Sequence, residues 1–432
     1  MTGSLAGCGD SPARTKPNIV LVTVDTLRAD HLEAYGYDRR TAPNLARLAS
    51  EGVRFSRAMA QAPWTLPSMA SLHSSLYPTQ HGAVEAKTAL PDTAVTLAER
   101  LRESGYATVG VVSHQFVGSK HGFSQGFDFF DERNSLGHEG VSSRALTKTA
   151  LEAVRDVPEP FFLWVHYFDP HFTYVRHPEY AFADGYEGSL PTKLTSERLV
   201  QGGGASIGPA DLDYIKAVYD EEIAFTDAEI GELWGALMER HGSDSSILVV
   251  TGDHGEYFLE RGRFFHGRDV YGELIGVPLV IGGAIPNDLR GSVVRVPVAT
   301  RSIPRTVMGL LGLSEEGFDG VDLFAVARGK DSEPVFAEGS HAFGVDARKR
   351  AVIDGSWKLI HRLDDDGYEL YDLEDDPGEK RNLWGSRAGS EAPIERLRGL
   401  LDEFNDLPGL PPKPVGLGPE AIRRLRALGY IE

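Results

Sequence analysis

The chain has 432 residues, enough to bury a large core without disulfide bonds or other cross-links. Its 44 lysines and arginines against 63 aspartates and glutamates give a formal net charge of −19, which argues against a nucleic-acid-binding protein because such proteins present a basic face. The single cysteine, Cys8, excludes both a disulfide framework and a cysteine-rich zinc site.

The N-terminal segment contains a sequence that resembles a bacterial lipobox. Leu5-Ala6-Gly7-Cys8 places small residues before a cysteine, and a polar stretch that could serve as a tether follows it to Lys16. No apolar signal segment precedes these residues in this sequence. Two interpretations stay open: a periplasmic or membrane-anchored lipoprotein attached through Cys8, or a disordered tail on a cytoplasmic protein. No run of about 18 apolar residues is present, so we expect no transmembrane helix.

Apolar runs that alternate with helical patterns predict an α/β fold with a mostly parallel central sheet and helices on both faces. The first run, Asn18–Asp25, is apolar almost throughout, as in a strand buried on both faces, and ends in an aspartate. Residues 41–52 predict a helix that ends at Gly52, and Leu212–Arg240 predicts a long helix with one apolar stripe. Four further strands are expected at Ala107–Ser113, Phe161–Tyr167, Ile247–Asp253 and Val277–Gly282.

The pattern changes after about residue 333 to short apolar segments separated by turns. Asp354-Gly355 and Asp366-Gly367 are typical turn sequences, so the segments around them predict a small antiparallel sheet: Val335–Glu338, Ala351–Ile353, Trp357–His361 and Glu369–Asp372. A final helix is expected over Pro419–Leu428. We therefore divide the chain into a tail at 1–16, an α/β domain at 17–330 and a smaller α+β subdomain at 331–432.

Two aspartates stand at predicted strand ends, where ligands collect in open α/β sheets. Asp25 ends the first strand, and Asp253 ends a later one with His254 directly after it. Two carboxylates and an imidazole are a suitable donor set for one divalent ion such as Mg²⁺, Mn²⁺ or Ca²⁺. A lone aspartate at a strand end is more often a cap or loop residue, but the adjacent histidine and the flanking glycines favour a metal site.

A hydroxyl group stands at the start of another predicted helix. Thr65 lies just ahead of Pro67, which can begin a helix, and helix N-termini attract anions through their free N–H groups and dipole. Thr65 is therefore a candidate nucleophile if a metal ion lies beside it. The alternative is that Thr65 is only the N-cap of this helix, and the segment by itself favours neither.

Together the motifs resemble those of sulfatases of the alkaline phosphatase superfamily. The resemblance runs in order from about residue 17 to residue 432, through Asn18–Asp25, Thr65-x-Pro67-Ser68, His81-Gly82, Gly252–Glu256 and Glu369–Leu383. It implies a metal-dependent ester hydrolase whose Asp25, Asp253 and His254 hold one divalent ion. Its substrate would be a small-molecule or glycan ester of sulfate or phosphate, with no nucleic-acid partner, and the oligomeric state stays open.

The same resemblance implies roles for further residues. His171 is similar to the substrate-binding histidine of the family, and His266 or Arg268 stands where the family has a lysine that contacts the anion. His171 or His266 would serve as the general acid, because the pKa of an imidazole lies near working pH. His114 and His166 would bind or orient the substrate. For each of these histidines a purely structural role is the alternative.

The sequence departs from the family at the nucleophile. Sulfatases carry a cysteine or serine that becomes formylglycine where this chain has Thr65, and threonine cannot form that aldehyde, so no formylglycine is expected. The arginine of the family motif is Met69 here. A threonine phosphoester can be released by a second attack at phosphorus, whereas a threonine sulfate has no comparable exit. The predicted activity is hydrolysis of sulfate, phosphate or phosphonate esters. The alternatives are a phosphodiesterase or transferase that uses Thr65, and an inactive glycan-binding homologue.

Overall fold

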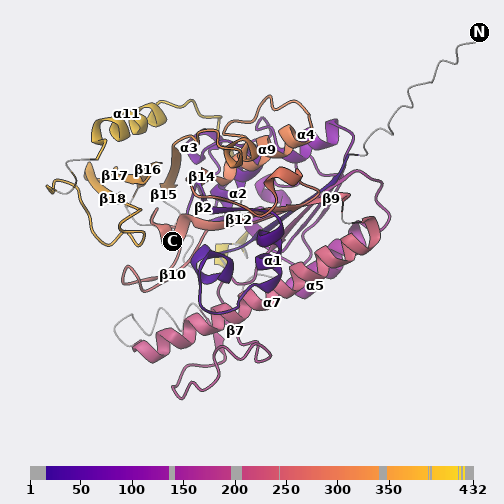
Figure 1. The fold of residues 1–432 in the computed structure, drawn as a ribbon, viewed down its shortest axis with the longest axis horizontal. Helices are drawn as coiled ribbons and strands as arrows, with labels where there is room; N and C mark the ends of the chain where they lie inside the picture. The colour runs from indigo at the N-terminus through magenta and orange to yellow at the C-terminus, as the bar shows by residue number, and fades with distance from the viewer. Residues whose placement is uncertain are drawn as a thin grey trace, which may run out of the picture.

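The computed structural model describes residues 16–135, 142–195, 207–242, 244–339, 348–387, 389, 392–416, 418–419 and 422–423. A nine-stranded sheet crosses its centre in the order β13-β2-β12-β9-β1-β6-β4-β5, with β14 paired to β2 (Figure 1). The strands are β1 Asn18–Val24, β2 Val53–Met59, β4 Ala107–Val112, β5 Phe129–Asp131, β6 Phe161–Tyr167, β9 Ser246–Gly252, β12 Gly276–Gly283, β13 Ser292–Val294 and β14 Val298–Ala299.

The five strands predicted for this sheet are confirmed, and so is its mostly parallel direction. β5, β4, β6, β1 and β9 run parallel to one another, and every residue of β1, β6 and β9 is buried, which explains their unbroken apolar sequences. β12 differs, because it runs antiparallel to both β9 and β2. The carboxyl ends of β1, β6 and β9 therefore meet at one edge of the sheet.

Helices cover both faces of the sheet (Figure 1). α1 (Pro43–Glu51), α5 (Ser143–Ala153) and α7 (Pro209–His241) pack on one face, where alternate β1 residues such as Val20 and Val22 point. α2 (Thr65–Ser74), α4 (Leu97–Glu103) and α9 (Ile303–Leu310) pack on the other face, against Ile19 and Leu21. The predicted helices at 41–52 and Leu212–Arg240 are thus present as α1 and α7.

Shorter elements connect these layers. The short α-helices are α3 Pro78–His81, α8 Gly272–Ile275 and α10 Leu323–Ala327. The short strand pairs are β3 Thr88–Ala89 with β19 Lys413–Pro414, β7 Tyr174–Val175 with β8 Lys193–Leu194, and β10 Tyr257–Phe258 with β11 Phe264–Phe265.

The predicted C-terminal antiparallel sheet is also confirmed. It consists of β15 (Val335–Gly339), β16 (Lys349–Asp354), β17 (Trp357–Arg362) and β18 (Gly367–Asp372), and α11 (Ile394–Asn405) packs on it through Leu397 and Leu401. Most of the helix predicted at Pro419–Leu428 and the whole lipobox-like segment lie outside the described residues. The division at residue 330 stays a prediction. Within the described ranges, no helix has the length and apolar character needed to cross a bilayer.

A buried ion pair fixes the C-terminal sheet to the loop that follows it and to the main domain. Lys358 Nζ, on β17, donates to the Glu379 carboxylate oxygens at 2.9 and 2.8 Å and to the Val270 carbonyl at 2.6 Å. Lys358→Met would leave the Glu379 carboxylate buried without its cation, so we expect the free energy of unfolding to fall by about 3 kcal/mol. Denaturant titration measures this loss. The double variant Lys358→Met/Glu379→Gln should regain most of the stability, and an equal loss in both variants would contradict the assignment.

Candidate active site

The three predicted metal ligands come together at the carboxyl edge of the sheet. β1 and β9 pair in register up to Val24 and Gly252, so Asp25 and Asp253 leave adjacent strands side by side. Asp253 Oδ1 accepts the backbone N–H groups of Thr26 at 3.0 Å and His254 at 2.7 Å. His254 Nε2 lies 3.4 Å from Asp25 Oδ1 and 3.5 Å from Asp253 Oδ2. Both carboxylates thus present an oxygen to the same imidazole nitrogen.

These donors fit a divalent cation. Both carboxylate oxygens of Asp25 and Oδ2 of Asp253 are buried without a hydrogen-bond donor among the described residues. Burial, followed by repulsion from Asp253 and Glu256, raises the pKa of Asp25 well above its usual range, and burial likewise raises the pKa of Asp253. Buried carboxylates with no donor and no counter-charge are costly, and a cation between them would offset that cost. The two-carboxylate, one-imidazole donor set suits a hard or borderline ion.

The loop after β9 holds His254 in one orientation. Its Nδ1–H donates to the Gly255 carbonyl at 2.9 Å, so Nε2 turns its lone pair toward the carboxylates. Burial, followed by the proximity of His266, lowers the pKa of His254 well below its usual range, so the ring is neutral as a metal ligand must be. Gly255 itself is packed tightly, because a Cβ there would lie 2.1 Å from the Glu273 carbonyl oxygen.

Gly255→Ala is therefore expected to displace the loop that carries His254 and to weaken divalent-ion binding about 10- to 100-fold. Calorimetric titration with Mn²⁺ measures the affinity. The matched control is Gly235→Ala in the exposed face of α7, where an added Cβ meets nothing within 4 Å. That variant should bind Mn²⁺ normally and be slightly more stable, because alanine is the better helix former. Equal affinities in the two variants would contradict the prediction.

Thr65 is the first residue of α2 and not its N-cap, which is Trp64. The N-cap interpretation of Thr65 is therefore wrong. Its Oγ1 lies 3.3 Å from His254 Nε2, so the hydroxyl faces the ligand group. Ser68 Oγ, one turn further, donates to the Asp253 carbonyl at 2.5 Å and ties α2 to the same loop. Met69, which replaces the arginine of the family motif, is buried in the core beneath α2.

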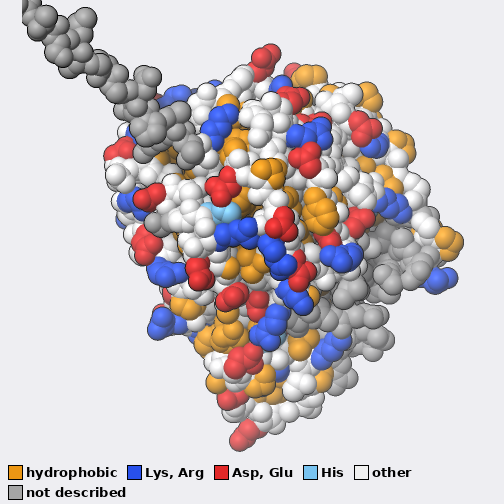
Figure 2. Space-filling view, turned by 90° about the vertical axis from the view of Figure 1, so that its right-hand side faces the viewer, with side chains coloured by type: hydrophobic (Ala, Val, Ile, Leu, Met, Phe, Trp, Pro, Cys, Tyr) orange, Lys and Arg blue, Asp and Glu red, His pale blue; other side chains and the backbone are white. Residues whose placement is uncertain are grey.

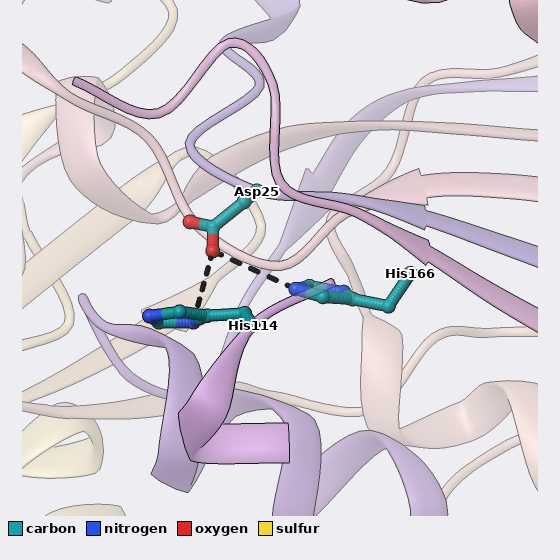
Figure 3. A group of neighbouring side chains, drawn as sticks. All are labelled: Asp25, His114 and His166. Atoms are coloured by element: carbon teal, nitrogen blue, oxygen red, sulfur yellow. Dashed lines mark ion pairs between the residues drawn. The ribbon is translucent and has the colours of Figure 1, made fainter. Parts of the chain in front are cut away.

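Four of the predicted histidines border this group. His114, after β4, places Nδ1 at 3.2 Å from Asp25 Oδ2, and His166, on β6, places Nε2 at 3.5 Å from the same oxygen (Figure 3). The rings of His266 and His254 have centroids 4.4 Å apart, and those of His266 and His171 are 5.0 Å apart. The histidines assigned to substrate binding and catalysis therefore lie around the ligand carboxylates.

Sequence reasoning missed the residues that orient His266. Its Nδ1 lies 3.1 Å from Glu256 Oε1, and the Tyr174 hydroxyl donates to Glu256 Oε2 at 3.1 Å. Burial raises the pKa of Glu256 well above its usual range and lowers the pKa of His266 to about 3, so burial favours the uncharged form of each group. In its protonated form Glu256 would donate to Nδ1, which leaves the N–H of a neutral His266 at Nε2. Glu256 is the last residue of the Gly252–Glu256 motif, and this position in the sequence could have identified it as a residue of the site.

The predicted role of Arg268 gains less support from its surroundings. The side chain is half-buried, and the charges that act on its guanidinium are those of Arg263 and Asp269. On the face drawn in Figure 2, acidic and basic side chains are interspersed. Capture of an anion by this acidic chain therefore depends on the local group at the sheet edge and not on a general surface charge.

The mostly parallel α/β sheet and this edge of carboxylates, histidines and a helix-borne hydroxyl are those of a hydrolase of the alkaline phosphatase superfamily. The family model named Sulfatase matches residues 17–313, so the chain belongs to the sulfatase family, as its motifs predicted. It is 24% identical over 441 residues to a Δ4,5-hexuronate-2-O-sulfatase of Bacteroides thetaiotaomicron, covering 93% of this chain and 91% of that protein. It is 26% identical to a choline-sulfatase of Rhizobium meliloti, covering 91% and 86% of the two chains. Its fold matches the phosphonate monoester hydrolase of Agrobacterium radiobacter with a TM-score of 0.72 at 20% identity, covering 90% and 95%.

Proposed function

We propose that this sulfatase-family chain is a metal-dependent hydrolase of monoanionic phosphorus esters, such as phosphonate monoesters and phosphodiesters, with Thr65 as its nucleophile. The observation that carries the proposal is the position of the Thr65 hydroxyl, at the first residue of α2 and 3.3 Å from His254 Nε2. Asp25, Asp253 and His254 would hold the ion. When bound, a divalent ion supplies the positive charge that lowers the pKa of a nearby hydroxyl and attracts an anionic ester.

The charge of the site favours a monoanionic substrate. Two carboxylates and one divalent ion sum to zero, and burial keeps His166 and His266 neutral because it lowers the pKa of each to about 3. Met69 contributes no cation. Such a site has little positive charge to spare for a dianion, whereas N–H donors from His266 and the α2 N-terminus suffice for a monoanion.

The residues of the chain divide the chemistry among them. Thr65 Oγ1 forms a bond to phosphorus while the bond from phosphorus to the leaving oxygen breaks, and the hydroxyl proton of Thr65 passes to solvent water. His171 donates its Nδ1–H to the Phe172 carbonyl at 2.6 Å, so Nε2 is the nitrogen that can take a proton from solvent and pass it to the leaving oxygen. His266 Nε2–H stabilises the charge on the transferred group. Water then attacks phosphorus, the bond from phosphorus to Thr65 Oγ1 breaks, and a proton of that water returns to Oγ1.

Sulfate ester hydrolysis is the second candidate, supported by the names of the two curated relatives, one of which acts on a hexuronate sulfate. The same geometry would transfer a sulfuryl group to Thr65. The two substrates differ in how the product leaves the enzyme. Water must attack the threonine sulfate directly, because threonine lacks the second hydroxyl through which a formylglycine hydrate expels sulfate. Sulfate esters are therefore expected to react once and to leave a long-lived adduct.

A substrate panel tests the proposal. Four aryl substrates are each assayed with Ca²⁺, Mg²⁺ and Mn²⁺: a sulfate ester, a phosphate monoester, a phosphate diester and a methylphosphonate monoester. We expect sustained turnover of the diester and phosphonate, and a single-turnover burst at most with the aryl sulfate. Steady turnover of the sulfate alone would favour the second candidate. If alcohol acceptors take the phosphoryl group in place of water, the chain is a transferase, and if no ester reacts, it is a binding homologue.

A further inference from the structure

We propose a second metal site beside the first, in which His114, His166 and Oδ2 of Asp25 bind a transition-metal ion of the Zn²⁺ class. It shares only Asp25 with the ion of the proposed function. The three side chains come from three neighbouring strand ends: Asp25 after β1, His166 on β6 and His114 after β4. Their donor atoms lie within 4.8 Å of one another, and all three side chains are buried.

The two oxygens of Asp25 face different partners. Oδ1 lies 3.4 Å from His254 Nε2, whereas Oδ2 lies 3.2 Å from His114 Nδ1 and 3.5 Å from His166 Nε2. Figure 3 shows both histidines directed at one carboxylate oxygen while the other oxygen points away from them. A carboxylate that offers one oxygen to each of two ions is the usual bridge in two-metal sites, where the ions lie about 3.5–4 Å apart.

Hydrogen bonding does not account for this arrangement. Nε2 of the fully buried His166 has no hydrogen-bond partner among the described residues. Its separation of 3.5 Å from Oδ2 is too long for a good hydrogen bond. Buried polar atoms without partners are rare in folded proteins and call for an explanation, and an ion between them provides one.

A supporting contact orients His166 as a ligand. The Thr23 hydroxyl oxygen accepts Trp164 Nε1–H at 3.0 Å and lies 2.8 Å from His166 Nδ1. Its second lone pair can accept Nδ1–H, which leaves the Nε2 lone pair directed at Asp25. Metal-binding histidines typically make this kind of bond through their other nitrogen.

The two donor sets would select different ions. The first has two carboxylates and one imidazole, which suits Ca²⁺, Mg²⁺ or Mn²⁺, and the second has two imidazoles and one carboxylate, which suits Zn²⁺. A second dication would also supply positive charge that Met69 cannot. With both ions present the site would carry a surplus of about two charges, which would extend its substrates from monoanions to dianionic phosphate monoesters.

Metal stoichiometry of the full chain tests this inference without any substrate. The chain is first saturated with Ca²⁺, then dialysed against Zn²⁺ with Ca²⁺ kept present, and elemental analysis counts the bound ions. We expect a total of two ions per chain, at least one of them Zn²⁺. A total that stays at one, with Zn²⁺ excluded or exchanged for Ca²⁺, would overturn the second site. Because this readout is independent of turnover, an inactive chain that binds two ions would refute only the proposed function.

A variant pair assigns the second ion to its ligands. His166→Gln should reduce the total from two ions to one and leave Ca²⁺ binding in place. The control is His73→Gln, which also replaces a buried histidine, one that packs on Trp164 with ring centroids 4.2 Å apart and belongs to neither donor set. It should keep two ions. Two ions in folded His166→Gln, or none, would overturn the assignment, and the wild-type count stands if a variant fails to fold.

Discussion

Thr65→Ala is expected to lower kcat/KM by about a thousandfold or more for every ester that the wild-type chain turns over. The substitution removes the atom proposed to attack the phosphorus of the substrate, and what remains is catalysis by binding and charge stabilisation alone. The side chain lies at the first position of α2, where alanine is well tolerated, so the fold should be unaffected. Steady-state kinetics with an aryl phosphonate monoester, alongside a thermal unfolding curve, measure both expectations.

Two neighbouring variants make this result specific. Thr65→Ser keeps a hydroxyl at the same position and should retain activity within about tenfold of the wild type. Ser68→Ala removes a hydroxyl from the same helix, the one that donates to the Asp253 carbonyl, and should reduce activity only modestly. Mass spectrometry should detect a covalent adduct on Thr65 after mixing with the aryl sulfate, and none in Thr65→Ala. Unchanged kinetics in Thr65→Ala would eliminate Thr65 as the nucleophile.

The strands that carry the site could be predicted because burial leaves a simple pattern in the sequence. β1, β6 and β9 are buried on both faces, so their apolar runs are unbroken and the polar residue at each carboxyl end stands out. The direction of β12 could not be predicted, because an apolar run is the same in either direction. β2 was also not predicted, because the half-buried Arg54 and Arg57 interrupt its run of apolar residues.

The ligands could be predicted more readily than the residues that support them. Asp25, Asp253 and His254 belong to short local motifs, whereas Tyr174 reaches Glu256 across 82 positions of sequence. The apolar stripe of α7 was recognised, but its buried acidic residues were not. Glu221 accepts the N–H groups of His177 and Ala183, and Glu222 accepts that of Val175, so α7 anchors the segment that carries Tyr174. Contacts of this kind depend on the packed tertiary structure and leave no periodic signal.

Asp25→Asn is expected to stabilise the metal-free chain and to abolish its stabilisation by divalent ions. Burial raises the pKa of both Asp25 and Asp253 above the value of about 3.9 in the unfolded chain, and the neighbouring carboxylates raise that of Asp25 further. The metal-free folded chain therefore has its full stability below about pH 4, where both carboxyl groups are protonated. It loses stability as the pH rises through the raised pKa values. Asparagine removes one of the two repelling charges, so the metal-free variant should unfold at a higher temperature than the metal-free wild type at neutral pH.

With the ion bound, the wild type should unfold at a higher temperature than Asp25→Asn. At a thousandfold excess over the dissociation constant, the ion stabilises the folded chain by about 4 kcal/mol, and the gain should widen from pH 4 toward pH 7 as the carboxylates lose their protons. Thermal unfolding with Mn²⁺ and with a chelator measures the difference for each chain. The control is Asp220→Asn, which replaces an equally buried carboxylate that pairs with Arg39 and His31. It should be less stable than the wild type with or without Mn²⁺ and should respond to Mn²⁺ normally. A normal Mn²⁺ response in Asp25→Asn would show that Asp25 is not a ligand, because losing a bridging carboxylate must weaken every ion bound to it.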